Sequence, residues 1–349
     1  MSPRVKVQHY VPQLLLRLHA HELAAKRGAE QVWCFDKQTD RVFSPNIRGV
    51  AAEARFYEAE VDGQTFSLED ALARLESRAA PALARVVERR TLQGLKRDDR
   101  VAIAAFTATQ FMRTPSIREE AAAMQEGLVA ALRARGIDPS VFPEAAPMSG
   151  EDIKLLSLDL LLDTPETFAP HFLNKHWHLI AATPEDPFHI GDNPVVRDNT
   201  TVRGPYGRLG VASPGVEIYL PLSPTLCLGM VDPAVVEDLE GKLAQAKRTH
   251  FKLQKLRAKK ARQAGRPKPT EEMDIADAAL RDLQARVRPF LNGTPSPYEP
   301  EVVTRVNSLQ MAYATRWVIS STSDFSLPKR MIADDEKFRR GPAAQMHWR

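Results

Sequence analysis

The chain contains few cysteines and few glycines, and both shortages exclude familiar kinds of site. Cys34 and Cys227 are the only cysteines among 349 residues and stand far apart, so neither a disulfide framework nor a CxxC zinc or redox motif is present. Such cysteine usage is typical of a reducing cytosol. Only 17 glycines occur, and there is no GxxxxGK[ST] loop, GxGxxG, GxSxG or HExxH run. Nucleotide binding through a P-loop is therefore not expected.

Long apolar runs are also missing. No stretch of 18 uncharged apolar residues occurs, and the first ten residues contain no apolar signal core. We therefore expect a protein that is neither secreted nor membrane-spanning and that is located in the cytoplasm. Hydrophobic residues at 43% and charged residues at 26% are ordinary for a folded chain of this length, which can bury a sizeable core.

Positive charge is concentrated in one stretch. The net charge is only +4, but Lys242 to Lys268 holds eleven Lys or Arg residues and no acid, which leaves the remainder of the chain with a surplus of seven acids. Apolar residues recur within this stretch at helical spacing, from Leu239 to Leu256, and neither Gly nor Pro interrupts it before Gly265. The pattern predicts a helix with an apolar seam and a basic face.

The acidic segment 271–291 is expected to return antiparallel to this helix, so that 232–292 forms a basic helical hairpin. The basic face then has two readings. It is either a solvated surface partly neutralised by the return helix, or a phosphate-binding surface, because non-specific attraction needs only positive charge density. The candidate nucleic-acid-binding residues are Lys247, Arg248, Lys252, Lys255, Lys259 and Lys260.

Periodicity elsewhere predicts an α+β fold, with a mostly antiparallel sheet packed on helices. Helices are expected over 68–90, 98–112 and 116–135, and β-favouring runs at 32–35 and 41–43 flank a turn and predict a hairpin. Residues 177–182, 188–191, 216–220, 226–230 and 317–320 read as strands. The charged residues 329–349 lack a period and are expected to form a surface tail.

Polar residues end the expected strand 188–191, which is followed by Asp192, Asn193 and Pro194. If residues 183–187 close a hairpin with Ala182 opposite Phe188, then His178 faces Asp192 on the neighbouring strand. Asp192 has two readings: it caps backbone amides, as Asp does in Asp-Asn-Pro turns, or it takes part in chemistry beside a histidine. Closely spaced histidines at 171, 176 and 178 are more typical of hydrogen-bonded structural residues than of metal ligands.

Two further polar clusters carry candidate site residues. His9 lies in Gln8-His-Tyr-Val-Pro12, where the proline favours extended backbone at the preceding residue. Glu53 could bind a metal, or pair with Arg55 or with Arg113. Arg113 precedes a proline break and could hold a phosphate or carboxylate through its planar guanidinium group.

These clusters, in this order, resemble a bacterial family known only as domain-of-unknown-function family 4238. The opening QHYVP and the DNPV at 192–195 are the most specific matches, and Gly191 departs from the Ser or Thr usual in the family. The matching positions are 8–12, 35–36, 50–53, 56–57, 110, 113–115, 190–195, 220–224, 307, 310 and 316. The resemblance implies a single integrated domain over 1–328, with the hairpin as an elaboration, and it implies no reaction.

The leading hypothesis is a metal-dependent phosphodiester hydrolase, a nuclease acting on RNA or DNA. Asp36, Glu53 and Asp192 would hold Mg²⁺ or Mn²⁺, His9 would be the general acid or base, and Arg113 would stabilise phosphate charge. One alternative is a non-catalytic module that binds nucleic acid or an acidic protein through the basic helix. Another is a protein that binds a second subunit through the hairpin's apolar seam.

Overall fold

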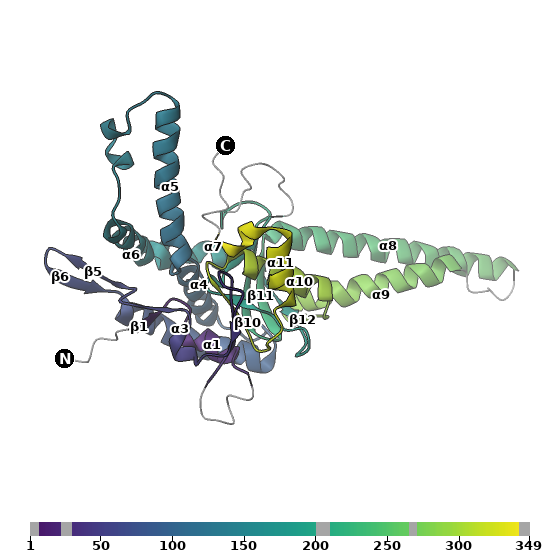
Figure 1. Ribbon diagram of the computed structural model, residues 1–349. Coiled ribbons are helices and arrows are strands. Elements are labelled where there is room, and N and C mark those ends of the chain that lie inside the picture. The colour runs from purple at the N-terminus through teal and green to yellow at the C-terminus, as the bar shows by residue number, and fades with distance from the viewer. Residues whose placement is uncertain (1–6, 22–29, 200–209, 265–270, 342–349) are drawn as a thin grey trace.

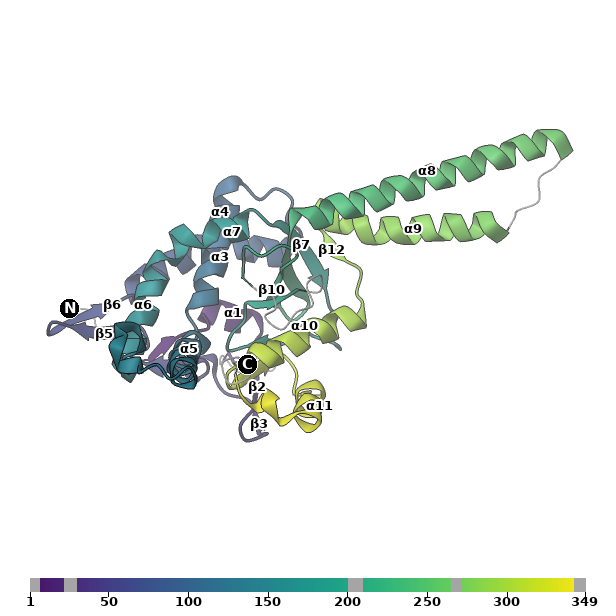
Figure 2. The same ribbon diagram turned by 90° about the horizontal axis from the view of Figure 1, so that it is seen from above.

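A body of strands and helices carries two helical projections (Figures 1 and 2). The computed structural model describes residues 7–21, 30–199, 210–264 and 271–341, without the side chains of 260–264 and 271–272. One projection is α5 (Pro115–Ala134) together with the start of α6 (Gly150–Thr167), and the other is the pair α8 (Pro233–Ala264) and α9 (Glu271–Asn292). The two projections leave the body in different directions.

The larger sheet has five strands in the order β12-β7-β11-β10-β9. All neighbours are antiparallel except β12, which runs parallel to β7. Strands β10 and β11 are buried along almost their whole length and form the hairpin at its centre. The bounds are β7 (His176–Ala181), β9 (Val196–Asp198), β10 (Glu217–Ser223), β11 (Leu226–Val231) and β12 (Pro295–Ser296).

A second sheet joins segments from both ends of the chain in the order β3-β2-β13-β8. Val318 of β13 pairs with Phe35 on one side and with Gly191 on the other. The strands are β2 (Trp33–Asp36), β3 (Val42–Phe43), β8 (Ile190–Gly191) and β13 (Trp317–Ser320), and the β2–β3 hairpin is the one that the sequence predicts. Two-stranded ribbons are formed by β1 (Val7–His9) with β4 (Ala52–Ala54) and β5 (Glu58–Val61) with β6 (Gln64–Ser67).

Helices pack against these sheets, and the predicted α+β class is confirmed. The three helices expected in the first half are present, and α5 begins with Pro115, where the missing N–H costs nothing. The remaining helices are α1 (Gln13–Leu18), α3 (Glu69–Arg89), α4 (Arg97–Met112), α7 (Ala169–Leu173), α10 (Pro300–Tyr313) and α11 (Ser326–Asp334). Short 3₁₀ turns are η1 (Ile47–Gly49), η2 (Pro139–Val141), η3 (Pro143–Ala145) and η4 (Glu336–Arg339). None of the helices that the structure describes is long and apolar enough to cross a bilayer.

The predicted helical hairpin is α8 followed by α9, and it extends away from the body (Figure 1). At about 1.5 Å per residue, the 32 residues of α8 span roughly 48 Å. Residues 265–270, which connect the helices, lie outside the described residues. At the base, His176 and His178 of β7 both lie against the ring of Phe290, with ring centroids 4.6 Å away in each case.

The expected pairing of His178 with Asp192 is wrong. β7 pairs with β11 and β12, so that His178 lies opposite Gly229, whereas β8 pairs with β13 in the other sheet. The His178 ring occupies the space that a side chain at Gly229 would need, which explains a glycine in the middle of this buried strand. The prolines at 184 and 187 break the chain between two sheets and do not close a hairpin.

The expected surface tail is also wrong in its first part. Residues 326–334 form α11, and Ile332 on this helix is only 3% exposed, packing in the same cluster as Phe35 and Phe325. The apolar positions 325, 328 and 332 repeat at helical spacing, but the charges around them hide the pattern. Residues 342–349 lie outside the described residues.

Substitution of Gly191 should destabilise the junction between β8 and α10. A Cβ at this position would lie 2.9 Å from the Gln310 carbonyl oxygen and 3.2 Å from the Ala314 side chain. We expect Gly191→Ala to lower the free energy of unfolding by about 1–3 kcal/mol, measured by urea denaturation. Gly49→Ala, where nothing lies within 4 Å of the added Cβ, should have a much smaller effect. Equal losses in both variants would contradict the packing argument.

Stability should fall as the pH is lowered from 6.5 to about 4. Burial lowers the pKa of His19 to about 4, of His178 to about 3 and of His189 to about 4, from an ordinary 6.5. Because the unfolded chain takes up protons in this range before the folded chain does, stability rises with pH there. Denaturation midpoints at pH 7 and pH 5 should differ less in His178→Gln or His189→Gln than in the exposed His171→Gln variant. If the midpoint changed by the same amount between pH 7 and pH 5 in all three variants, burial of these histidines would not be the cause of the loss of stability.

Candidate functional site

The buried guanidinium group of Arg113 connects three segments of the N-terminal half. Its Nε donates to the Tyr57 hydroxyl at 2.9 Å, Nη1 to Glu76 Oε1 at 2.6 Å and Nη2 to the His9 carbonyl at 2.8 Å. Burial works to lower the pKa of Arg113, but Tyr57 and Glu76 outweigh it and raise the pKa. With a side chain only 3% exposed and all three nitrogens engaged, Arg113 has the environment of a structural residue, and the geometry gives no support to a role in holding phosphate.

The QHYVP segment is held through both its side chains and its backbone. Gln8 donates to Glu58 Oε1 at 3.3 Å and accepts from the Tyr57 amide at 2.6 Å. The Tyr10 carbonyl accepts from Gln110 Nε2 at 2.9 Å. His9 Nε2 lies 3.2 Å from the Ile47 carbonyl, and burial is the main cause that lowers its pKa. His9 therefore has a backbone partner, and its role as a general acid or base stays a prediction.

The carboxylate of Asp192 is buried and accepts hydrogen bonds from three backbone amides. Its Oδ1 accepts from Thr315 N at 2.7 Å, and its Oδ2 accepts from Arg316 N at 2.8 Å and from Trp317 N at 2.9 Å. Burial raises the pKa of Asp192, and the three amides oppose that shift. Asp192 thus caps backbone amides, which is one of the two roles that the sequence allows. The capped segment lies more than 120 residues away in sequence.

Asp36 is paired with Arg316 next to this cap. Arg316 Nη2 donates to Asp36 Oδ2 at 2.9 Å, and the guanidinium group lies 4.3 Å from the centre of the Trp317 ring. Burial works to raise the pKa of Asp36, but the hydrogen bonds from Arg316 and the Gln38 amide lower it overall. The Asp36 side chain is 5% exposed and that of Arg316 is 44% exposed, so only the cation of this pair faces solvent.

Sequence reasoning missed Lys37, which is fully buried. Its Nζ donates to the carbonyls of Met311, at 2.9 Å, of Ala314 and of Arg340, at 3.3 Å. A cation at the end of α10 complements the free carbonyls and the negative end of the helix dipole. Burial lowers the pKa of Lys37 to about 8. Nothing in the sequence around Lys37 indicates this burial, because its partners are 274 to 303 residues away.

Two amide side chains of α10 fix the strand-ending motif of residues 187–194. Gln310 accepts from Gly191 N at 2.8 Å and donates to the Pro194 carbonyl at 2.9 Å. Asn307 accepts from His189 N at 2.8 Å and donates to the Pro187 carbonyl at 3.0 Å. Both side chains are buried and bridge backbone that no strand partner satisfies. The motifs singled out in the sequence thus meet mainly as a hydrogen-bonded scaffold.

The three carboxylates proposed as metal ligands do not form such a group. Glu53 lies exposed on β4, opposite Gln8, while Arg55 and Arg113 pair with Glu58 and Glu76. Across the described residues, no three His, Cys, Asp or Glu side chains are placed together so as to hold a metal ion. Asp36 and Asp192 each accept hydrogen bonds through both oxygens, so the structure gives no support to a Mg²⁺ or Mn²⁺ site at these residues, and metal binding stays a prediction.

The basic helix presents a continuous charged face. Residues 248, 252, 255 and 259 are separated by four, three and four positions, so they lie within a sector of roughly 60° around α8. We call these four residues the outward stripe: Arg248, Lys252, Lys255 and Lys259, all exposed. The seam residues Leu243, Ala246 and His250 lie about half a turn away and face α9.

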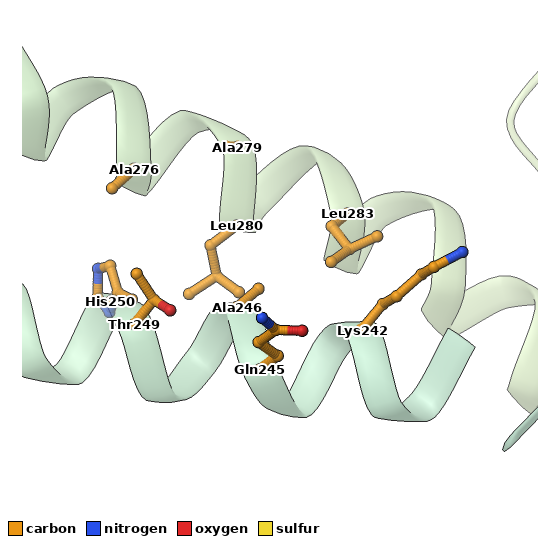
Figure 3. Close-up of a pocket in the computed structure, with 9 residues that line it drawn as sticks. All are labelled: Lys242, Gln245, Ala246, Thr249, His250, Ala276, Ala279, Leu280 and Leu283. Carbon is orange, nitrogen blue, oxygen red and sulfur yellow. The ribbon is translucent and has the colours of Figure 1, made fainter. Parts of the chain in front are cut away.

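The inner side of the hairpin is different in character. His250 pairs with Asp277 across the two helices, and a groove of about 370 Å³ runs between them (Figure 3). Leu280 and Leu283 of α9 point from one side of this groove toward Ala246 and Gln245 of α8. An acid of α9 thus contacts the seam, whereas no residue of the outward stripe forms a salt bridge within the described part of the chain. Lys247 is exposed but lies about 100° from the stripe, and the Lys260 side chain is outside the described residues.

Asp192→Asn should destabilise the fold strongly. The amide nitrogen that replaces one carboxylate oxygen cannot accept hydrogen bonds, so at least one buried backbone N–H would lose its partner. We expect the free energy of unfolding to fall by about 2–3 kcal/mol in chemical denaturation. Asp159→Asn on the exposed face of α6 is the matched control and should change stability by less than about 0.5 kcal/mol. A stable Asp192→Asn protein would show that the cap is dispensable.

Comparison with known proteins agrees with the resemblance seen in the motifs. No curated protein and no solved structure matches the chain. The sequence profile of one family, described as a protein of unknown function (DUF4238), matches residues 7–324. This range includes every element from β1 to β13 and therefore both sheets, the Asp192 cap and the helical hairpin. The chain belongs to the DUF4238 family.

Proposed function

We propose that the protein binds the phosphate backbone of nucleic acid, without reading base sequence, through the outward stripe of α8. The observation that carries this proposal is the placement of the four exposed cations on the helix face opposite to α9. The acids in α8 all precede Lys242, and the acidic partner helix lies against the seam. A face arranged only for solvation would not need four of its cations in one line on the side that is turned away from α9.

The dimensions of the stripe are suited to a polyanion. Successive cations lie about 4.5–6 Å apart along the helix axis, over a total of roughly 16 Å, and double-stranded DNA carries a charge about every 1.7 Å of its axis. Within α8 the only aromatic residue is Phe251, so a ladder for stacking unpaired bases is missing from this helix. We therefore favour contacts with the backbone of a duplex over contacts with single-stranded bases.

The metal-dependent nuclease remains a second candidate that the geometry does not favour. Its proposed phosphate ligand, Arg113, and two of its three carboxylates are buried in hydrogen bonds. The basic helix would serve a nuclease equally well for substrate attraction. The binding experiment below therefore includes Mg²⁺ and Mn²⁺ and is also read for cleavage products.

Removal of two stripe charges should weaken binding and reduce its salt dependence. We expect Lys252→Gln with Lys255→Gln to lower the affinity for a labelled duplex about tenfold near 50 mM salt, and to reduce the slope of log K against log salt by about two, since two phosphate contacts are lost. Fluorescence anisotropy of duplex DNA and duplex RNA, titrated at several salt concentrations, measures both quantities.

The matched control carries the same charge change on another helix. Arg74 and Arg78 are exposed on α3 and form no salt bridge within the described residues, so Arg74→Gln with Arg78→Gln should leave the slope unchanged. An equal loss of affinity in both double variants would show that binding depends on net charge and not on the outward stripe. Absence of duplex binding by the wild-type protein at 50 mM salt would overturn the proposal.

A further inference from the structure

Helix α6 exposes leucines that nothing in the described structure covers. Leu156 is 37% exposed, Leu160 is 40% exposed and Leu162 is 49% exposed. Eight of the sixteen large hydrophobic side chains that are exposed among the described residues lie between Met124 and Leu162. Such a concentration on one projection is typical of an interaction surface and differs from the scattered apolar residues of an ordinary surface.

The apolar face of α6 is flanked by acids. Positions 152, 156, 159 and 163 are separated by four, three and four residues and share one side of the helix, on which Asp152, Asp159 and Asp163 alternate with Leu156 and Leu160. The helix has five acids and one lysine. Asp159 and Asp163 are exposed and form no salt bridge within the described residues. We call Asp152, Leu156, Asp159, Leu160 and Asp163 the acidic face.

The acidic face has the same spacing as the outward stripe of α8, with the opposite charge. Both helices carry a row at positions i, i+4, i+7 and i+11; on α8 all four are cations, whereas on α6 three are aspartates, the i+4 position is Leu156, and Leu160 lies beside the row. Phe251 and Leu256, 55% and 56% exposed, lie on either side of the stripe and offer apolar contacts for Leu156 and Leu160. The match in spacing and charge identifies a basic amphipathic helix as the occupant, and excludes an anionic lipid or nucleic acid.

We infer that the acidic face of α6 binds the outward stripe of α8 from a second copy of the chain. In both views α6 and the α8–α9 hairpin lie on opposite sides of the body, so one copy cannot close this contact on itself (Figures 1 and 2). The contact is heterologous, because each copy uses a different surface, and every bound copy still offers one free surface of each kind. The association is held by exposed charges and is therefore weakened by salt.

Charge exchange between the two surfaces tests this inference. The full-length protein is examined by sedimentation velocity at 50 mM and 500 mM salt, up to about 100 µM. We expect the wild-type protein to self-associate at low salt. The association constant should fall at least about tenfold in Lys252→Glu with Lys255→Glu, and likewise in Asp159→Lys with Asp163→Lys, since each change replaces attraction by repulsion. A mixture of the two variants should associate again, because the intact acidic face of the stripe variant can bind the intact stripe of the α6 variant, and the two reversed surfaces are also complementary.

Glu88→Lys with Asp334→Lys is the matched control for the acidic variant, since both residues are exposed and form no salt bridge within the described residues. Circular dichroism confirms that each variant is folded. A wild-type protein that stays monomeric at low salt would overturn the inference, as would variants that associate normally or a mixture that fails to associate. Because Asp159→Lys with Asp163→Lys leaves the stripe intact, its duplex binding is measured separately, and failure of the nucleic-acid proposal leaves this test unaffected.

Discussion

The buried carboxylate of Asp192 is the contact on which the second sheet depends. It accepts hydrogen bonds from three consecutive backbone amides, those of residues 315–317, at the point where the chain leaves α10 and enters β13. β13 is then the central strand between β2 from the N-terminal region and β8 from the middle of the chain. Arg316, next to the cap, forms an ion pair with Asp36, and Lys37 donates hydrogen bonds to the carbonyls at the end of α10. A carboxylate pays a desolvation cost in this position, and three charge-assisted hydrogen bonds offset it.

The polar motifs of this chain therefore have a shared structural role. Arg113 joins Tyr57, Glu76 and the His9 backbone, and the amide side chains of Asn307 and Gln310 satisfy the backbone of residues 187–194. Such residues are buried where the chain cannot form a regular ladder, so polar side chains replace strand partners. A scattered set of His, Asp, Glu and Arg residues looks the same in a sequence whether it surrounds a substrate or ties loops together. Only burial and partners separate the two.

The surface features point outward from this scaffold. The outward stripe of α8 and the acidic face of α6 are opposite in charge, equal in spacing and carried on separate projections. Both proposals use the stripe, so nucleic acid and a second copy would compete for it. Occupancy would then depend on salt and on the relative concentrations of duplex and protein.

Local patterns in the sequence determine most of the long helices, the β2–β3 hairpin and the face on which the basic residues of α8 lie, because each depends on spacing within a few turns of chain. They also suggest that Asp192 caps amides, but not which amides. The tertiary structure alone decided that β7 and β8 belong to different sheets, that Lys37 is buried, and that Asp36, Glu53 and Asp192 do not form one ligand group. These outcomes depend on segments up to about 300 residues apart, whose meeting is set by burial of the whole core and leaves no periodic trace in the sequence.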